Sequence, residues 1–340
     1  MSTNVFPDLC NCGGPITRRT FLKTTLSGVA AAAAAPLPIL HTARAADAGT
    51  KAPTSETLVT TLYKSLSEAQ KKVVAFPFDH PLRLKVDNNW HIIDKKLSEF
   101  FTPDQQAMIR EIFNGLHSPA YAERVLKQVE HDNSDDGGFG GCTVALFGEP
   151  GTGKFEFVFA GRHVTRRCDG DSVEGAAFGG PIFYGHAAQS FHEKPDHPGN
   201  AYWYQALRAN EVFQALDGKQ RQIALLAEPR AEKGTDTVKL TGKKTGLPGI
   251  PISELSRDQQ EHVRQVMADV LAPFRPADAD EALKLVEANG FDNLHMAFYK
   301  NHDIGNDGVW DVWQIEGPAM LWYFRGEPHV HTWVHVRQSA

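Results

Sequence analysis

Apolar residues in the first third of the chain recur at the three- and four-residue intervals of amphipathic helices. The segment from Thr54 to Val74 is predicted to be a helix. Thr102-Pro103-Asp104-Gln105 has the residues of a helix start, with a Thr cap, a Pro in the first position and a Gln three residues after the cap. The pattern therefore predicts one helix that begins at Pro103 and another from Ser118 to Val129.

The spacing changes to alternation after Asp132, which is typical of strands. The predicted strands of this middle region are Thr143 to Phe147, Phe155 to Ala160, His163 to Cys168 and Val173 to Tyr184. Helical spacing then returns in Tyr202 to Leu216, in Gly218 to Leu226 and after Ser256-Arg257-Asp258-Gln259. The similarity of TPDQQ and SRDQQ is interpreted as shared helix-start chemistry rather than as an internal duplication.

The end of the chain alternates again and predicts an antiparallel meander. Its strands are Leu294 to Tyr299, Val309 to Ile315, Ala319 to Phe324 and His329 to Val336, with turns at Asn306-Asp307-Gly308 and Arg325-Gly326-Glu327. The Gly-, Lys- and Thr-rich stretch from Lys233 to Gly249 is expected to be an exposed connection or hairpin. Together these elements predict an α+β fold: a mainly antiparallel sheet flanked by helices, with an N-terminal helical segment and a C-terminal β-meander.

The first 45 residues have the composition of an export signal. Paired arginines, Arg18 and Arg19, precede Phe21-Leu22-Lys23 and a mildly apolar stretch, and Ala43-Arg44-Ala45 fits a signal-peptidase site. This arrangement resembles a twin-arginine signal peptide. We therefore expect a signal peptide over residues 1–45 and a single α+β domain over residues 46–340. The twin-arginine translocase and signal peptidase are the expected export partners, and the expected location is the periplasm or the outside of the cell.

A transmembrane anchor is the alternative for the same stretch. A spanning helix needs about 20 apolar residues, and the run from Leu26 to Leu40 is shorter and is interrupted by Pro36 and Pro38. No later stretch is apolar enough to span a bilayer, so no stable membrane insertion is expected. The whole chain has a net charge of −6, and cleavage after Ala45 would make it −9. An acidic protein of this kind is a poor candidate for nucleic-acid binding.

Two cysteines, Cys142 and Cys168, remain after cleavage, and the sequence allows either one disulfide or two thiols. A separate motif, Gly148 to Lys154, has the spacing of a phosphate-binding loop. Phe155 stands where that loop needs Ser or Thr, and the alternating phenylalanines that follow indicate a strand instead of a helix. We therefore interpret the motif as a hairpin turn and expect no nucleotide site.

Histidines are the strongest candidates for chemistry. His329, His331 and His335 alternate along the final predicted strand and so share one face. Gly161-Arg162-His163 places another histidine at the start of a predicted strand, and His186 ends an apolar one. The hypothesis is that His163, His329 and His331 bind one metal ion, with His335 or His186 as a fourth ligand. Such a set favours zinc or copper over iron or manganese.

A structural cluster is the alternative, in which these histidines are hydrogen-bonded to Glu174, Glu316 or the backbone. If the metal is catalytic, zinc would support hydrolysis with Glu174 or Glu316 as general base, whereas copper or iron would support redox chemistry. His192 and His197 are interpreted as surface residues. No role is assigned to five further histidines, which are His80, His91, His117, His131 and His262.

The same residues resemble a bacterial family of exported proteins, domain-of-unknown-function family 3500. The matching pieces are Gly161-Arg162-His163, Pro181-Ile182-Phe183-Tyr184-Gly185, Ile315-Glu316-Gly317-Pro318 and His329-Val330-His331-Thr332. The family pattern has a histidine pair in place of Arg162-His163 and an arginine in place of His335. The positions that the residues and the resemblance both select are therefore His163, His329 and His331. The resemblance implies no activity.

The sequence thus predicts an exported histidine-ligated metalloprotein, either a metal-dependent hydrolase or an oxidoreductase, whose small-molecule substrate is unknown. The alternative is a non-catalytic periplasmic ligand-binding protein with a structural histidine cluster. In that alternative, aromatic residues of the last strands would line the ligand surface, although aromatics on strands are more often core. These residues are Trp310, Trp313, Trp322, Tyr323 and Trp333.

Overall fold

The computed structural model describes residues 54–186, 201–202, 204–300, 302 and 308–340. The predicted signal peptide, the turn residues Asn306 and Asp307, and the loop that holds His192 and His197 lie outside this range. Within it, no helix combines the length and the apolar character that a membrane crossing needs.

One sheet of eleven strands runs through the protein, and most of its pairings are antiparallel. The strands of its first half are β1 (Ala75–Phe76), β2 (Thr143–Gly148), β3 (Phe155–Gly161), β4 (Val164–Cys168) and β5 (Ile182–His186). Those of its second half are β6 (Leu225–Leu226), β7 (Ile250–Pro251), β8 (His295–Tyr299), β9 (Val312–Gly317), β10 (Met320–Arg325) and β11 (Val330–Val336). The order across the sheet is β1-β2-β3-β4-β5-β11-β10-β9-β8-β6, with β7 paired to β8.

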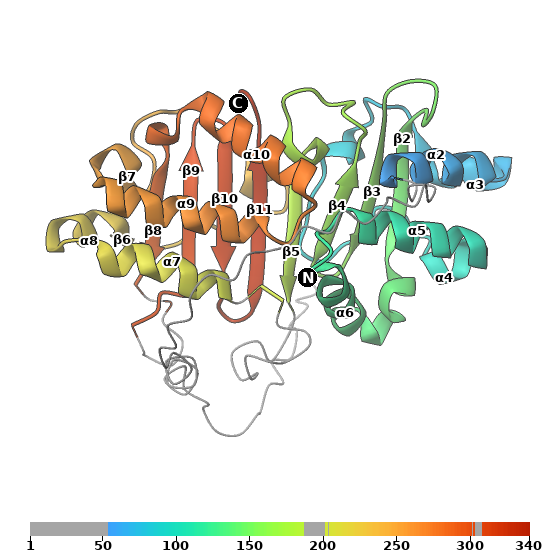
Figure 1. The fold of residues 1–340 in the computed structure, drawn as a ribbon. Coiled ribbons are helices and arrows are strands. Elements are labelled where there is room, and N and C mark those ends of the chain that lie inside the picture. The colour runs from blue at the N-terminus through green and yellow to red at the C-terminus, as the bar shows by residue number, and fades with distance from the viewer. Residues whose placement is uncertain (1–53, 187–200, 203, 301, 303–307) are drawn as a thin grey trace, which may run out of the picture.

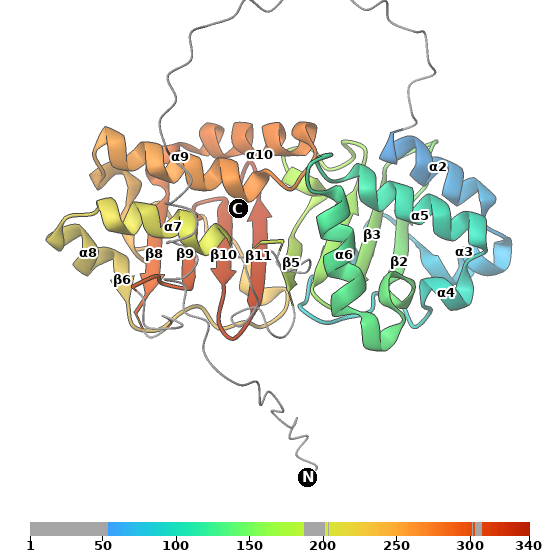
Figure 2. The same ribbon diagram turned by 60° about the horizontal axis from the view of Figure 1, so that its bottom comes forward.

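Helices cover one face of this sheet (Figures 1 and 2). They are α2 (Ser55–Ser65), α3 (Glu68–Val74), α4 (Leu97–Phe100), α5 (Pro103–Gly115), α6 (Ala122–Asp132), α7 (Tyr204–Ala215), α8 (Gly218–Ala224), α9 (Arg257–Leu271) and α10 (Pro276–Asn289). Short 3-10 turns lie between them. The α+β class and the mainly antiparallel sheet flanked by helices are therefore confirmed.

Helix starts follow the local chemistry that the sequence indicates. Thr102 and Ser256 both cap their helices through reciprocal bonds with a Gln three residues later, which are complete capping boxes. The single helix predicted from Thr54 to Val74 is wrong, because Leu66 and Ser67 are extended and Ser67 caps a second helix. The helix that begins at Pro276 was not predicted.

The two halves of the chain have the same order of elements. Each begins with a helix pair and a two-residue strand, continues with further helices, and ends in a four-stranded meander. The two-residue strand pairs in parallel with the first strand of its meander in both halves. The last strands, β5 and β11, pair antiparallel at the centre, so an approximate two-fold axis passes through the sheet there. Attributing the similarity of TPDQQ and SRDQQ to helix-start chemistry alone is therefore wrong, because the two motifs occupy equivalent helices.

Equivalent side-chain contacts are also found in the two halves of the chain. The amide of Gln70 donates to Oε1 of Gln105 at 2.8 Å, and the amide of Gln220 donates to Oε1 of Gln259 at 3.0 Å. In each half the first glutamine also caps its own helix and bonds a backbone carbonyl just before the helix that carries the second. The same glutamine pair thus joins α3 to α5 in the first half and α8 to α9 in the second half.

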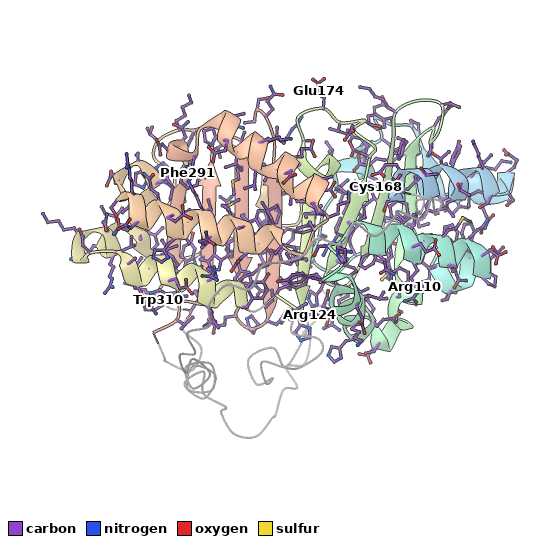
Figure 3. The ribbon with its side chains drawn as sticks, viewed as in Figure 1. Arg110, Arg124, Cys168, Glu174, Phe291 and Trp310 are labelled. Atoms are coloured by element: carbon purple, nitrogen blue, oxygen red, sulfur yellow. The ribbon has the colours of Figure 1, made fainter. Side chains whose placement is uncertain are left out.

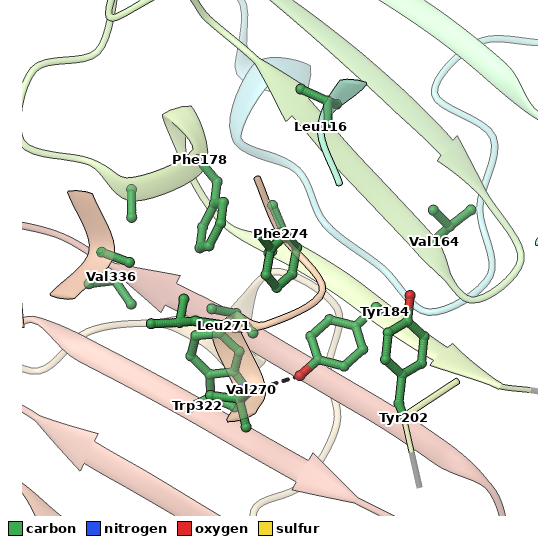
Figure 4. Close-up of a cluster of buried hydrophobic side chains, with 14 of the residues drawn as sticks. Leu116, Val164, Phe178, Tyr184, Tyr202, Val270, Leu271, Phe274, Trp322 and Val336 are labelled. Carbon is green, nitrogen blue, oxygen red and sulfur yellow. Dashed lines mark hydrogen bonds between the residues drawn. The ribbon is translucent and has the colours of Figure 1, made fainter. Parts of the chain in front are cut away.

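The main core lies between the sheet and the helices (Figure 4). The Tyr184 hydroxyl accepts a hydrogen bond from the Trp322 indole at 3.1 Å, which joins β5 to β10 at the centre of the molecule. A smaller cluster on the opposite face includes Tyr323 and Trp333. Trp313, Trp322, Tyr323 and Trp333 are at most 1% exposed, so these aromatics are core residues and form no ligand surface.

The strand positions in the sheet test three local predictions: the turn at Gly148 to Lys154, the strand over Val173 to Tyr184, and the state of the two cysteines. Gly148 to Lys154 is the turn of the β2–β3 hairpin, closed by a bond from the Glu149 amide to the Lys154 carbonyl at 3.0 Å, as predicted. The strand predicted over Val173 to Tyr184 is wrong in its first part, because β5 begins only at Ile182 and the preceding segment makes just an isolated bridge from Ala176 to Arg337. Cys142 and Cys168 are both buried free thiols on opposite sides of β3, since Cys142 adjoins β2 and Cys168 belongs to β4.

Candidate metal centre

His163 stands in the turn between β3 and β4, not within a strand. Its φ is 59°, in the left-handed region, and its backbone amide donates to the Asn88 carbonyl at 2.8 Å. On the other side of the residue, the His163 carbonyl accepts from the amide of Gly185 at 3.1 Å. These two bonds hold the turn against β5 and fix the position of the imidazole.

His331 is the second residue of β11, and His329 is the residue immediately before that strand. In the sheet, His331 is opposite Gly185 of β5 and Arg325 of β10. Because Gly185 has no side chain and bonds the His163 carbonyl, the β3–β4 turn and the start of β11 can approach each other across it. His329 precedes His331 by two positions, so both side chains are on the same face.

The three imidazoles converge through their Nε2 atoms. His331 Nε2 lies 3.1 Å from His163 Nε2 and 2.9 Å from His329 Nε2. The ligand atoms of the three residues all lie within 4.8 Å of one another, and this is the one such group within the described residues. His163 and His331 are only 3% and 4% exposed, whereas His329 is partly exposed. We call these three residues the histidine cluster.

Asp132, the last residue of α6, orients His163. Its Oδ2 is 3.2 Å from His163 Nδ1, and its Oδ1 is 3.1 Å from Nδ1 of His186 at the end of β5. Burial by itself would raise the pKa of Asp132, but the hydrogen bonds from the two histidines outweigh it and hold the pKa well below its ordinary value. Asp132 is therefore a carboxylate, and both Nδ1 atoms carry the protons that they donate to it.

Glu232, in the loop after β6, orients His331. Its Oε2 is 2.7 Å from His331 Nδ1, and its Oε1 forms an ion pair with Arg325 at 2.9 Å. Burial raises the pKa of Glu232, and the guanidinium of Arg325 opposes that shift. Two of the three imidazoles thus have a carboxylate on Nδ1, which is the usual outer-shell arrangement of metal-bound histidine.

All three imidazoles of the histidine cluster are held neutral. Burial is the main cause: it lowers the pKa of His163, lowers that of His331 well below its ordinary value, and lowers that of His329 to about 2. Since Nδ1 of His163 and of His331 carries the proton, each Nε2 presents a lone pair. Two lone pairs 3.1 Å apart form no hydrogen bond, so this contact is suited to a cation between them.

The ion geometry fits the observed spacing. Two nitrogens each 2.0–2.1 Å from a zinc ion at a tetrahedral angle are about 3.3 Å apart. The contacts of 2.9 and 3.1 Å between Nε2 atoms are close to that value. Three protein ligands leave a fourth tetrahedral position for water or a ligand.

His335 lies outside the histidine cluster. It is four residues further along β11, about 13 Å from His331 at 3.3 Å per residue, and its Nδ1 bonds the Val238 carbonyl at 3.0 Å. His186 is separated from the cluster by Asp132, to which it bonds, and so belongs to the support of His163. Neither predicted fourth ligand therefore lies with the other three.

The two glutamates suggested as general bases lie elsewhere as well. Glu316 pairs with Arg230 at 2.6 Å, and Leu321 connects it in register to His335, at the far end of the strands from His331. Glu174 is exposed at the opposite end of the sheet from the start of β11 (Figure 3). The carboxylates that do contact the histidine cluster, Asp132 and Glu232, were not identified from the sequence. Asp132 ends a helix and Glu232 lies in a loop, and both are far in sequence from the histidines that they contact. No local spacing therefore predicted either contact.

Comparison with known proteins gives one match. The family model described as a protein of unknown function (DUF3500) matches residues 48–339, which is more than half of the chain. No curated protein and no solved structure matches the chain significantly.

Proposed function

Because the chain belongs to the family described as a protein of unknown function (DUF3500), its function must be inferred from the site itself, and we propose that it is a metalloprotein. His163, His329 and His331 bind one transition-metal ion through their Nε2 atoms. The observation that carries this proposal is the contact between the Nε2 atoms of His163 and His331, two buried neutral imidazoles whose lone pairs face each other at 3.1 Å. A cation relieves the repulsion of that contact and a neutral hydrogen-bonded cluster does not.

Three neutral imidazoles suit zinc or copper better than iron or manganese. A site with three protein ligands and an open position is typical of catalytic zinc, whereas structural zinc sites are usually closed by four ligands. The ion would lower the pKa of a bound water and polarise a bound carbonyl or phosphoryl group. The residues of the chain hold the ligands: Asp132 and Glu232 fix the tautomers of His163 and His331 and increase the basicity of their Nε2 atoms.

A metal-dependent hydrolase is therefore the activity that we infer first, and an oxidoreductase is the second if the bound metal is copper or iron. The ligand-binding alternative has less support, because four of the five aromatics that motivated it are buried and only Trp310 is partly exposed. The paired arginines and the small-residue cleavage site support export of the folded, metal-loaded protein by the twin-arginine pathway. Replacing Arg18 and Arg19 by Lys tests this part, and normal export of that variant would contradict it.

Metal analysis tests the main proposal. The mature protein, purified without a histidine tag, should contain close to one equivalent of zinc, copper, iron or manganese. The double variant His329→Ala/His331→Ala should lose it. His335→Ala is the matched control, because it removes a histidine from the same strand outside the histidine cluster, and it should keep the metal. Circular dichroism checks that each variant is folded. Absence of metal in the wild-type protein, even after reconstitution, would make the histidine cluster structural.

A further inference from the structure

A polar cavity of about 260 Å³ adjoins the histidine cluster. It is lined by Asn89, His91, Asp132, Asn133, Asp135, Asp136 and Arg162. Asp132 links the cavity to the cluster directly, since its Oδ2 is 3.2 Å from Nδ1 of His163. Arg162 is the residue before His163. The cavity is therefore built on the same turn and helix end that position one of the three imidazoles.

The backbone of Arg162 is held on both sides. Its amide donates to Oδ1 of Asn133 at 2.9 Å, its carbonyl accepts from Nδ2 of Asn133 at 3.1 Å, and it forms an isolated bridge with Asn89. By contrast, its partly buried guanidinium has no hydrogen-bond or ion-pair partner anywhere in the described part of the chain. A rigid backbone thus presents an unsatisfied cation to the cavity.

The other groups of the cavity are largely engaged with the protein. Asp136 pairs with Lys96, and His91 lies 3.4 Å from the same carboxylate. The side-chain amide of Asn133 is used by Arg162 and by the Val129 carbonyl. Asp135 is exposed. The guanidinium of Arg162 is therefore the main charged donor that the cavity offers to a ligand.

Charges around the histidine cluster also favour an anion. The carboxylates of Asp132 and Glu232 contact its imidazoles, and the guanidinium of Arg325 neutralises Glu232. Arg162 directly precedes His163 in the chain and lines the same cavity as Asp132, so its positive charge lies beside the cluster. Asp132 and Glu232 are balanced by Arg162 and Arg325, and Asp136 is balanced by Lys96. The exposed Asp135 is then the one remaining carboxylate of the cavity lining, and it offsets only half of the charge of a divalent ion on three neutral imidazoles. An anionic ligand would balance the rest.

We propose that Arg162 binds the oxyanion, a carboxylate or a phosphate, of the small molecule that the metal centre takes. The guanidinium offers paired N–H donors in a plane that matches such groups. This inference rests on the proposed function, because it assigns the substrate class of the same site. It makes Arg162 a determinant of specificity and not a metal ligand.

Titration of two simple probes tests the proposal. Inorganic phosphate and oxalate are added separately to the mature protein loaded with Co²⁺, and binding is followed by calorimetry and by the visible spectrum of the ion. Arg162→Gln should weaken binding of the preferred probe by about 10- to 100-fold, the loss expected for charge-assisted hydrogen bonds. Arg162→Lys should recover part of the affinity. Arg257→Gln, which removes an exposed arginine at the start of α9, should bind like the wild type.

The preferred probe distinguishes a phosphate ligand from a carboxylate ligand. Equal affinity in wild type and Arg162→Gln, or no saturable binding of either probe by the wild type, would overturn the proposal. All variants should keep one equivalent of metal, which separates this outcome from failure of the metal site. If the wild type binds no metal, the proposed function fails, and Arg162-dependent binding of a probe to the metal-free protein would still support an oxyanion site.

Discussion

The Nε2 atoms of His163 and His331 lie 3.1 Å apart, although 168 positions separate the two residues in the chain. The turn between β3 and β4 brings one imidazole to this point and the start of β11 brings the other. Asp132 and Glu232 accept hydrogen bonds from Nδ1 of His163 and of His331, respectively, and so set the tautomers of these two imidazoles. The contact therefore depends on two carboxylates outside the histidine cluster, and the role of each can be tested.

Asp132→Asn should lower metal affinity by about 10- to 100-fold, the usual effect of losing an outer-shell carboxylate. The amide cannot accept two N–H donors in the way that the carboxylate accepts those of His163 and His186. Competition with a chromophoric chelator measures the affinity. Asp258→Asn, which changes an exposed carboxylate in the first turn of α9, is the control and should bind metal like the wild type. Unchanged affinity in Asp132→Asn would contradict the positioning role.

Glu232→Gln should also weaken metal binding, by about 10-fold or more, because it removes the acceptor that orients His331. It also leaves Arg325 without its ion-pair partner, so some loss of stability is expected with it. Chelator competition and thermal denaturation, measured on the same samples, separate the two effects. Glu228→Gln, an exposed glutamate of the same segment, should change neither.

His335 should make the protein sensitive to acid. Burial lowers its pKa from 6.5 to about 4, so between these values the unfolded chain binds the proton and the folded protein does not. The stability that His335 contributes is therefore complete above pH 6.5 and is lost as the pH falls towards 4, by about 3 kcal/mol. Urea unfolding of wild type and His335→Gln from pH 7.5 to 4 measures this. The variant should lose less stability on acidification; parallel curves would show that the imidazole is not the cause.

The hydrogen-bonded glutamine pairs, Gln70–Gln105 and Gln220–Gln259, should contribute similar amounts to the free energy of unfolding. Gln105→Ala removes hydrogen bonds to Gln70 and to the Ser65 carbonyl, and Gln259→Ala removes those to Gln220 and the Ala215 carbonyl. Each change should lower the free energy of unfolding by about 1–3 kcal/mol, and the double variant by close to the sum, because the two sites are far apart. Gln265→Ala, which removes an exposed bond within α9, should cost less than about 0.5 kcal/mol.

Features that depend on neighbouring residues were predictable from the sequence. The caps at Thr102 and Ser256 and the hairpin turn before Phe155 need only a few adjacent side chains, and each is confirmed. Strand alternation placed His329 and His331 on one face. It placed His335 there too, but alternation gives the face and not the distance, and four residues of strand carry His335 beyond reach.

Features that depend on the assembled sheet were not predictable in the same way. Glu232 meets His331 because the loop after β6 crosses the face of β10 and β11, and no local spacing encodes that path. His163 belongs to a turn although alternation favoured a strand, because its left-handed backbone meets Asn88 and Gly185. The internal repeat was missed because a capping motif is expected at any helix start, and the equivalence of the two halves becomes visible only in the order of the strands across the sheet.

The approximate two-fold axis has an evolutionary consequence. It relates His163 to Ala319, because the β3–β4 and β9–β10 turns both have two residues. Tyr184 pairs with Val164 as Val336 pairs with Met320, so counting back along the chain from Val336 and Tyr184 relates His331 to Gly179 and His329 to Ala177. Two copies of a chain of half this length would give such a sheet if they first met as a symmetric homodimer and their genes were then fused. The histidine cluster is shared between the two halves, with His163 from the first and His329 and His331 from the second. None of the equivalent residues is a histidine, so only one of the two symmetry-related positions carries such a cluster.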